Sequence, residues 1–364
     1  MTIPSNILDA ITIAFWASFL GAAIFAYPIW KLLLLTKSRQ TVSEFAPSTH
    51  LAKQGTPTMG GLIIMVGFIA ATWVLDAKTS TPIVASTLAL FLGFAAIGFL
   101  DDFIVPRAIK GKRGLGWKQK FILQAIIAGA CVYFHSGKVL DARWALITFI
   151  VVFMANAYNF CDGLDALAGS ILLFFGTGVL LLSMAGDIVP EPAMIATALI
   201  AAVIPFLYLN APPAKVFMGD VGALPIGAVL GLAIAGIASP RAEAYVASTD
   251  GSILQQGMAQ LQVEGILWRP EMFVPLGILC VIMFIELVPV PLQIASVKLF
   301  KRKIFPFTPI HHAFEKAGWP ESRVVWMFAM TQIVLVALAM FAFKGAPSPQ
   351  LAHPRHMTHL GVTR

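Results

Sequence analysis

The sequence predicts an all-α integral membrane protein that crosses the bilayer about ten times, with both termini on the extracytoplasmic side. Hydrophobic residues make up 58% of the 364 residues and charged residues only 12%, against roughly 25% charged residues in a soluble domain. Mean hydropathy is +0.83, and long apolar stretches recur along the chain. A soluble globule would lack polar residues to cover its surface, and disorder requires low hydrophobicity and high charge.

The apolar stretches have the length of a membrane-crossing helix, about 20 residues. The first has no basic segment before it, so we interpret it as a span and not as a cleaved signal peptide. We expect one transmembrane domain over residues 1–343, with an external cap at about 239–271 and a cytoplasmic loop at about 297–322, and then a polar tail over 344–364. The ten predicted spans cover roughly residues 9–31, 58–75, 83–100, 119–135, 143–157, 167–185, 193–210, 222–238, 272–296 and 323–343.

Lysine and arginine are distributed unevenly between the two sides of the predicted membrane. The net charge is +7, and 17 of the 25 Lys and Arg residues fall in the loops after odd-numbered spans, with 8 on the other side. The positive-inside rule places the richer loops in the cytoplasm. The basic excess therefore indicates topology, and we expect no nucleic-acid partner. The three cysteines show neither a disulfide framework nor a CxxC metal pattern, and we interpret Cys161 as a packing residue.

Two polar segments adjoin the second and third spans on the cytoplasmic side. Residues 53–61 include Lys53 and Thr58, and their glycines and helix N-terminal amides fit either helix capping or phosphate binding. Asp101 and Asp102 end the third span, where the helix dipole disfavours acidic side chains. We interpret this pair as a site for a divalent cation or for proton transfer, and not as a solvated helix end. A basic stretch that fits either phosphate binding or topology follows at Arg107, Lys110, Lys112, Arg113, Lys118 and Lys120.

Two more polar segments follow the fifth and seventh spans. Residues 156–165 carry Asn159, Asp162 and Asp165 but no lysine or arginine, so topology does not explain them. Asp162 and Asp165 are three residues apart and would share a face of a helical turn. Residues 210–222 carry Asn210, Phe217 and Asp220. Asp220 fits either a helix N-cap or a ligand role, and Phe217 fits a stacking surface.

The last polar segment lies between the ninth and tenth spans. His311 and His312 are followed by Glu315, a combination that suits acid–base or phosphate chemistry. Across all five segments carboxylates dominate, and hard oxygen ligands favour Mg²⁺ or Mn²⁺ over Zn²⁺. Carboxylates beside basic residues predict phosphate chemistry, and the membrane location is consistent with a lipid phosphate as one substrate.

Taken together, the segments resemble the phospho-N-acetylmuramoyl-pentapeptide transferases of the polyprenyl-phosphate N-acetylhexosamine-1-phosphate transferase superfamily. The likeness runs from about residue 45 to 343, and Glu286, Gln293, Ser296 and Lys298 also fall at family-like spacing. The motifs that carry it, in the family's order, are KQGTPTMGG, GFLDDF, NAYNFCDGLDALAG, KVFMGDVGALPIG and PIHHAFEKAGWPESRV.

The resemblance implies a multi-pass protein of the bacterial cytoplasmic membrane with an active site that faces the cytoplasm. It implies transfer of phospho-MurNAc-pentapeptide from UDP-MurNAc-pentapeptide to undecaprenyl phosphate. The products would be lipid I and UMP, in the first membrane step of peptidoglycan synthesis. Mg²⁺ would be the cofactor, and membrane lipids and a second copy of the chain would be partners.

The resemblance also implies roles for individual residues. Asp220 would ligate Mg²⁺, and Asp101 and Asp102 would either deprotonate the lipid phosphate or help to place the metal and the diphosphate. Phe217 would stack on uracil. The implied catalytic residues are Asp101, Asp102, Asp220 and His311, and the implied substrate-binding residues are Lys53, Thr58, Asn159, Asp162, Asp165, Asn210, Phe217 and His312.

The chain departs from the family pattern at three places. Ala313 replaces the third of three consecutive histidines, and Val105 stands where a lysine usually follows the acidic pair. Arg107 or Lys110 is a candidate replacement for that lysine. Two prolines, at positions 289 and 291, predict a break or kink in the ninth span.

Two other functions remain open from the sequence. A sister transferase would use UDP-GlcNAc or another UDP-sugar. A transporter would place its polar sites near the bilayer midplane on broken helices, whereas the carboxylates here lie at span ends.

Overall fold

The computed structural model describes residues 5–36, 55–79, 82–109, 111–112, 114–136, 138–185, 190–238 and 269–344. Within these ranges the regular structure is helical and contains no β-strand, which confirms the predicted all-α class. The helices are α1 (Ser5–Leu35), α2 (Gly61–Thr79), α3 (Pro82–Phe99), the π-helical turn η2 (Leu100–Ile104), α4 (Val105–Ala108), α5 (Trp117–His135), α6 (Ala142–Phe160), α7 (Leu167–Ala185), α8 (Pro190–Asn210), α9 (Asp220–Ala238), α12 (Pro270–Leu279), α13 (Val281–Leu287), α14 (Pro289–Phe300), α15 (Ile310–Lys316) and α16 (Glu321–Lys344).

Each of the ten predicted spans overlaps helix, but α5, which covers the fourth, is not among the stretches apolar enough to cross a membrane. Eight stretches of the described chain are long and apolar enough to cross a membrane, and two shorter apolar helices cover Gly61–Leu75 and Pro270–Leu279. The chain is therefore an integral membrane protein by the length and composition of its helices. The count of ten spans and the side on which the termini lie remain predictions.

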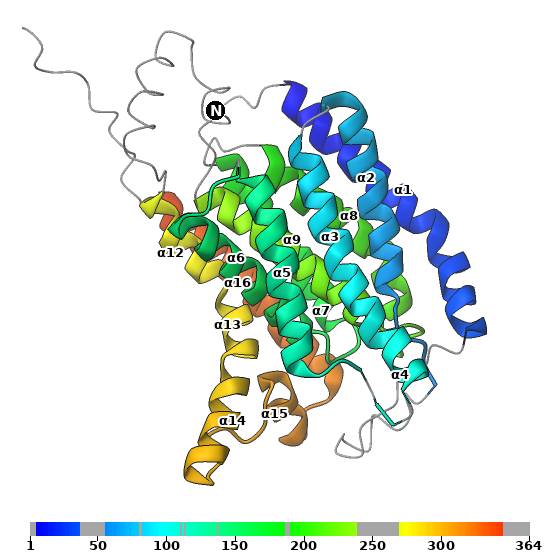
Figure 1. Cartoon of the computed structure of the whole chain (residues 1–364), viewed down its shortest axis with the longest axis vertical. Coiled ribbons are helices and arrows are strands. Elements are labelled where there is room, and N and C mark those ends of the chain that lie inside the picture. Colours follow the sequence, from blue (N-terminus) through cyan, green and yellow to red (C-terminus); the bar gives the residue numbers. More distant parts are fainter. Residues whose placement is uncertain are drawn as a thin grey trace, which may run out of the picture.

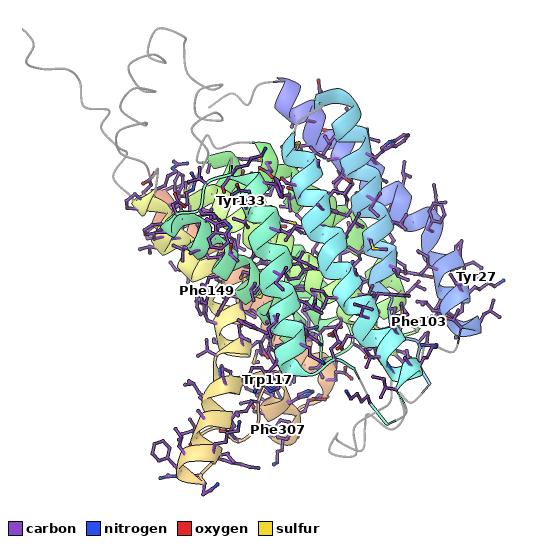
Figure 2. The ribbon with its side chains drawn as sticks, in the orientation of Figure 1. Tyr27, Phe103, Trp117, Tyr133, Phe149 and Phe307 are labelled. Carbon is purple, nitrogen blue, oxygen red and sulfur yellow. The ribbon has the colours of Figure 1, made fainter. Side chains whose placement is uncertain are left out.

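Helix α9 occupies the centre of the bundle, with α3 and α6 packed against it. Nearly every residue of α9 is buried, which explains why its sequence is apolar on all sides. The outer surface is also apolar, because it carries exposed side chains such as Tyr27, Trp117 and Phe149, which point away from the helices in Figure 2. A soluble protein would not expose so much apolar surface, whereas a bilayer matches it.

The predicted ninth span is divided into three helices. As its prolines predict, a new helix, α14, begins at Pro289. A further division at Cys280, between α12 and α13, was not predicted. Figure 1 shows α13 and α14 leaving the bundle, with α15 beside them.

Several predicted regions lie outside the described residues. These are most of the external cap, at 239–268, and most of the tail, at 345–364. The proposed domain limits therefore remain predictions.

Candidate active site

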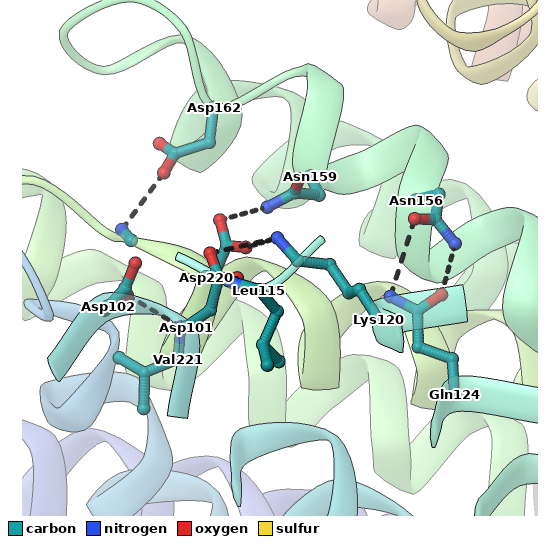
Figure 3. Close-up of polar contacts among 11 residues, drawn as sticks. Asp101, Asp102, Leu115, Lys120, Gln124, Asn156, Asn159, Asp162, Asp220 and Val221 are labelled. Atoms are coloured by element: carbon teal, nitrogen blue, oxygen red, sulfur yellow. Dashed lines mark hydrogen bonds and ion pairs between the residues drawn. The ribbon is translucent and has the colours of Figure 1, made fainter. Parts of the chain in front are cut away.

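Three carboxylates from two helices meet at one end of the bundle. Asp101 and Asp102 lie on η2, and Asp220 is the first residue of α9. One oxygen from each carboxylate lies within 4.8 Å of the other two, and Figure 3 shows the three side chains close together. The π-helical turn between α3 and α4 is a form of helix often found at functional sites. Residues 119 positions apart in the sequence therefore form one acidic cluster.

Each carboxylate is oriented by an N–H donor. The backbone N–H of Leu115 donates to Asp101 Oδ1 at 2.7 Å, and that of Val221 donates to Asp102 Oδ2 at 3.2 Å. The Asn159 side chain donates from Nδ2 to Asp220 Oδ1 at 2.8 Å. The positions of the acids are thus fixed by the protein itself.

Lys120 is the cation within this cluster. Its Nζ lies 3.0 Å from Asp101 Oδ2 and 2.5 Å from Asp220 Oδ2. Lys120 lies in the first turn of α5, so a third helix contributes to the site (Figure 3). With all three carboxyls ionised, the acids and this ammonium carry a formal charge of −2.

The donor set fits Mg²⁺. Hard carboxylate oxygens at the end of a helix bundle are the ligands that Mg²⁺ prefers, and a divalent cation would offset the residual charge of −2. A soft metal would favour sulfur or imidazole ligands, and the candidate metal cluster in the described chain consists of carboxylates alone.

Two glycines allow the acids to approach one another. A Cβ on Gly98 would lie 2.3 Å from the carbonyl carbon of Asp220, so only glycine lets the end of α3 touch the start of α9. Gly219 has φ +73°, which favours glycine, and its Cβ would lie 2.6 Å from both Asp102 Oδ2 and Thr58 Oγ1. Thr58, which the resemblance implies is a substrate-binding residue, therefore borders the acidic cluster and is buried.

The loop between α6 and α7 reaches the site through Asp162. Its Oδ2 accepts a hydrogen bond from the backbone N–H of Gly219 at 3.1 Å, directly before Asp220 (Figure 3). Burial raises the pKa of the Asp162 carboxyl to about 7, and the bond from Gly219 opposes the rise. Burial also raises the pKa of the adjacent Cys161 thiol well above its usual range, which agrees with a packing role for Cys161.

Asp165, in the same loop, and Asn210, the last residue of α8, both bond to backbone. The backbone N–H of Ala214 donates to Asp165 Oδ2 at 3.0 Å. Asn210 accepts from the N–H of Ala166 and donates to the carbonyl of Val216. Both side chains are almost fully buried. They tie the loop after α6 to the segment before α9, so they support the shape of the site.

Phe217 is half-buried, between the buried residues Val216 and Met218. Its backbone N–H donates to the carbonyl of Pro57 at 2.9 Å, and its carbonyl accepts from Gly60 N–H at 2.7 Å. The segment that begins α2 therefore holds the segment that precedes Asp220.

The two predicted histidines have different surroundings. His311 is fully buried, and its Nδ1 lies 2.8 Å from Glu286 Oε2. His312 is partly exposed, and its Nδ1 lies 2.6 Å from Glu315 Oε2. His311 also contacts the loop after α6, because a Cβ on Gly163 would lie 2.2 Å from His311 Nε2.

Lys53 and Lys110 lie outside the described residues. Arg107, the other candidate to replace the family lysine at position 105, faces elsewhere: it donates to the carbonyl of Thr36 at 2.9 Å and stacks on Phe103. In the described chain Lys120 supplies the charge beside the acids. The sequence showed Lys120 only as one of six basic residues, and Glu286 only through its spacing.

Sequence reasoning also missed a polar pair next to Lys120. One turn further along α5, Gln124 accepts a hydrogen bond from Asn156 Nδ2 at 2.6 Å (Figure 3). Gln124 is fully buried. A polar pair inside an apolar bundle fixes the register of α5 on α6, and hence the position of Lys120.

The fold and this site define a class of membrane-embedded enzyme. Residues 84–238, which hold the three acids and Lys120, match the glycosyl transferase family 4 model. Residues 53–65 match signature 1 of the phospho-N-acetylmuramoyl-pentapeptide transferases.

Curated relatives cover most of the chain. The phospho-N-acetylmuramoyl-pentapeptide transferase of Clostridioides difficile is 34% identical over 327 residues, covering 84% of this chain and 89% of the relative. That of Geobacillus thermodenitrificans is 34% identical over 350 residues, covering 91% and 97%. The chain belongs to the phospho-N-acetylmuramoyl-pentapeptide transferase family, which confirms the resemblance and the expectation of a transferase of peptidoglycan synthesis.

Proposed function

We propose that this chain transfers phospho-MurNAc-pentapeptide from UDP-MurNAc-pentapeptide to undecaprenyl phosphate, and so produces lipid I and UMP. The observation that carries the proposal is the cluster of Asp101, Asp102 and Asp220 around Lys120 in a chain of this family. Family membership favours this reaction over the transporter and over a sister transferase that uses UDP-GlcNAc.

Mg²⁺ is the proposed cofactor, with Asp220 as its ligand and Asp101 and Asp102 beside it. When bound, Mg²⁺ would neutralise the diphosphate and stabilise the departing UMP. The acids are already oriented by the N–H donors of Leu115, Val221 and Asn159, so little reorganisation would accompany binding.

Lys120 would offset the repulsion between two anionic substrates. Its ammonium lies between Asp101 and Asp220, where it can face both phosphate groups. A phosphate monoester has a second pKa of about 6 and is largely ionised at neutral pH. A strong base is therefore unnecessary, and we assign Asp101 and Asp102 to the placement of metal and phosphate.

The uridine pocket is proposed to form around the loop after α6 and the segment before α9. Phe217 would stack on uracil, with Lys53, Thr58, Asn159 and Asp162 at its edges. Asp165 and Asn210 would act mainly through the backbone ties described above. The catalytic His311 and the substrate-binding His312 would complete the site from α15.

The reaction is tested with purified protein in nanodiscs, Mg²⁺, undecaprenyl phosphate and each UDP-sugar separately, scored by UMP release. We expect release with UDP-MurNAc-pentapeptide. The control variant is Asp141→Asn, which is expected to release UMP as the wild type does. Asp141 caps the far end of α6, and Asn is an equally good cap. Release with UDP-GlcNAc alone would contradict the proposal.

The site is proposed to face the cytoplasm, because the loops on its side carry most of the lysine and arginine. A cysteine at the exposed position Lys112, in a background without other cysteines, is expected to be labelled only from the cytoplasm. Labelling from outside would contradict the predicted orientation.

The homodimer implied by the family is a separate proposal. Its test is the mass of the protein extracted directly from membranes in polymer nanodiscs. Two copies in each particle support the dimer, and one copy contradicts it.

A further inference from the structure

A buried acid–histidine pair lies on the side of the site away from Lys120. Glu286 on α13 and His311 on α15 are both fully buried. Glu286 uses its two oxygens separately: Oε1 accepts the backbone N–H of His311 at 3.2 Å, and Oε2 lies 2.8 Å from His311 Nδ1. A carboxylate has only acceptors, so this geometry calls for a hydrogen on Nδ1.

The other ring nitrogen faces a glycine. His311 Nε2 is buried and has no hydrogen-bond partner within the part of the chain described. A Cβ on Gly163 would lie 2.2 Å from Nε2, 2.8 Å from Cε1 and 3.3 Å from Cδ2. These distances place the Cβ direction outward from the Nε2 corner of the ring. The Gly163 backbone therefore leaves little room for a hydrogen on Nε2.

We propose that Glu286 is a positioning residue that holds His311 as the neutral tautomer with hydrogen on Nδ1 and a lone pair on Nε2. Glu286 fixes one ring nitrogen, and the close approach of Gly163 disfavours a hydrogen on the other. Glu286 then sets both the ring orientation and the tautomer, as a hydrogen-bond partner of one ring nitrogen often does.

This assignment limits what His311 can recognise. A lone pair accepts from N–H or O–H groups and repels phosphate oxygens. His311 Nε2 is therefore suited to accept from a hydroxyl or imide N–H of the UDP-sugar, and it does not donate to the diphosphate. The inference rests on the proposed function only for its substrate.

The primary test is nitrogen NMR of protein labelled with ¹⁵N-histidine in lipid, which distinguishes protonated from unprotonated ring nitrogens. The chain has 7 histidines, and the His311 signals are identified as those lost in His311→Asn. We expect a protonated Nδ1 and an unprotonated Nε2. A protonated Nε2 would overturn the proposal whether or not the enzyme makes lipid I.

Glu286→Gln sharpens the test. Its single oxygen accepts the fixed backbone N–H of His311, so its NH₂ group faces Nδ1 and donates to it. The hydrogen is then expected to move to Nε2, which requires the Gly163 backbone to shift away from the ring. If the tautomer does not change in a folded variant, the proposal is wrong; if the variant does not fold, the wild-type spectrum alone decides.

Turnover supplies an independent readout. We expect kcat/KM for UDP-MurNAc-pentapeptide to fall about 10–100-fold in Glu286→Gln, as for other outer partners of histidine, while Asp141→Asn stays near wild type. Unchanged kcat/KM with an inverted tautomer would overturn the positioning role. Absence of UMP release in the wild type would instead contradict the proposed function and leave the NMR result standing.

Discussion

The helical stretch formed by α3 and η2, and helix α5 beside it, carry polar clusters at both ends, and the two clusters are balanced differently. At one end Asp101 and Lys120 meet Asp220 and leave a formal excess of negative charge. Fifteen residues away on each helix, or about 22 Å, Ser86 contacts His135 Nδ1 at 2.9 Å.

Glu191 of α8 completes the second cluster. It accepts from Thr87 at 2.9 Å, and it lies 3.8 Å from His135 Nε2. Here one acid meets one histidine and neutral hydroxyl groups, so no two acids are brought together. The comparison teaches that a surplus of like charge, and not polarity alone, distinguishes a ligand site from a helix clamp.

Asp220→Asn would have the largest effect at the charged end. It removes the proposed metal ligand while its amide oxygen still accepts from Asn159. We expect UMP release to fall by about 10³-fold, with an unchanged melting temperature in the absence of Mg²⁺. Near wild-type turnover would refute the metal assignment.

Lys120→Gln would separate charge balance from catalysis. Removal of the ammonium makes the cluster more negative, so the Mg²⁺ concentration for half-maximal activity is expected to fall while maximal turnover drops by about 10²-fold. The measurement is a Mg²⁺ titration of UMP release, with Asp141→Asn as control. A weaker response to Mg²⁺ would show that Lys120 helps to assemble the metal site.

Gly98→Ala would test whether the acids depend on the close approach of α3 and α9. Its Cβ would meet the Asp220 backbone, so the helices must separate. We expect turnover to fall by at least about 10-fold, with a loss of about 1–3 kcal/mol in stability from overpacking. Gly277→Ala is the matched control, because nothing lies within 4 Å of its Cβ position.

Glu191→Gln would act on the balanced end. The amide still accepts from Thr87 but loses the charge opposite His135. We expect a loss of about 1 kcal/mol, seen as a melting temperature lower by a few degrees, with turnover below that temperature unchanged. A large loss of turnover at constant stability would mean that this end also serves the reaction.

Asp162→Asn would change the stability of the ligand-free protein by an amount that depends on pH. A carboxyl with a pKa raised to about 7 on folding contributes stability that is full below about pH 4 and lost as the pH rises through 7. Asn does not titrate, so the melting temperature of the variant relative to wild type is expected to rise by a few degrees between pH 5 and pH 8. The measurement uses ligand-free protein with EDTA, and a constant difference would contradict the assignment.

The helices were predictable because a long apolar stretch indicates a membrane-crossing helix by itself, without knowledge of which helices it packs against. Asp101 and Asp102 were predictable because the helix dipole disfavours acids at a helix C-terminus. Asp220 was predictable only through the family resemblance, because an acid also fits a helix N-cap. The place of Lys120 was not, because its contact with Asp220 joins residues 100 positions apart and depends on how α5 packs. For the same reason the sequence did not show that Asn210 is bonded to backbone on both sides, or that Arg107 turns toward α1.

The central helix also bears on how the protein could evolve. Asp220 starts a helix that is packed on every side, and its backbone touches Gly98. An inhibitor that bound the Asp220 carboxylate would be difficult to evade by mutation, because moving that group means moving the core of the bundle. Resistance would be expected instead at half-buried side chains of the proposed uridine pocket, such as Phe217, which do not belong to that core.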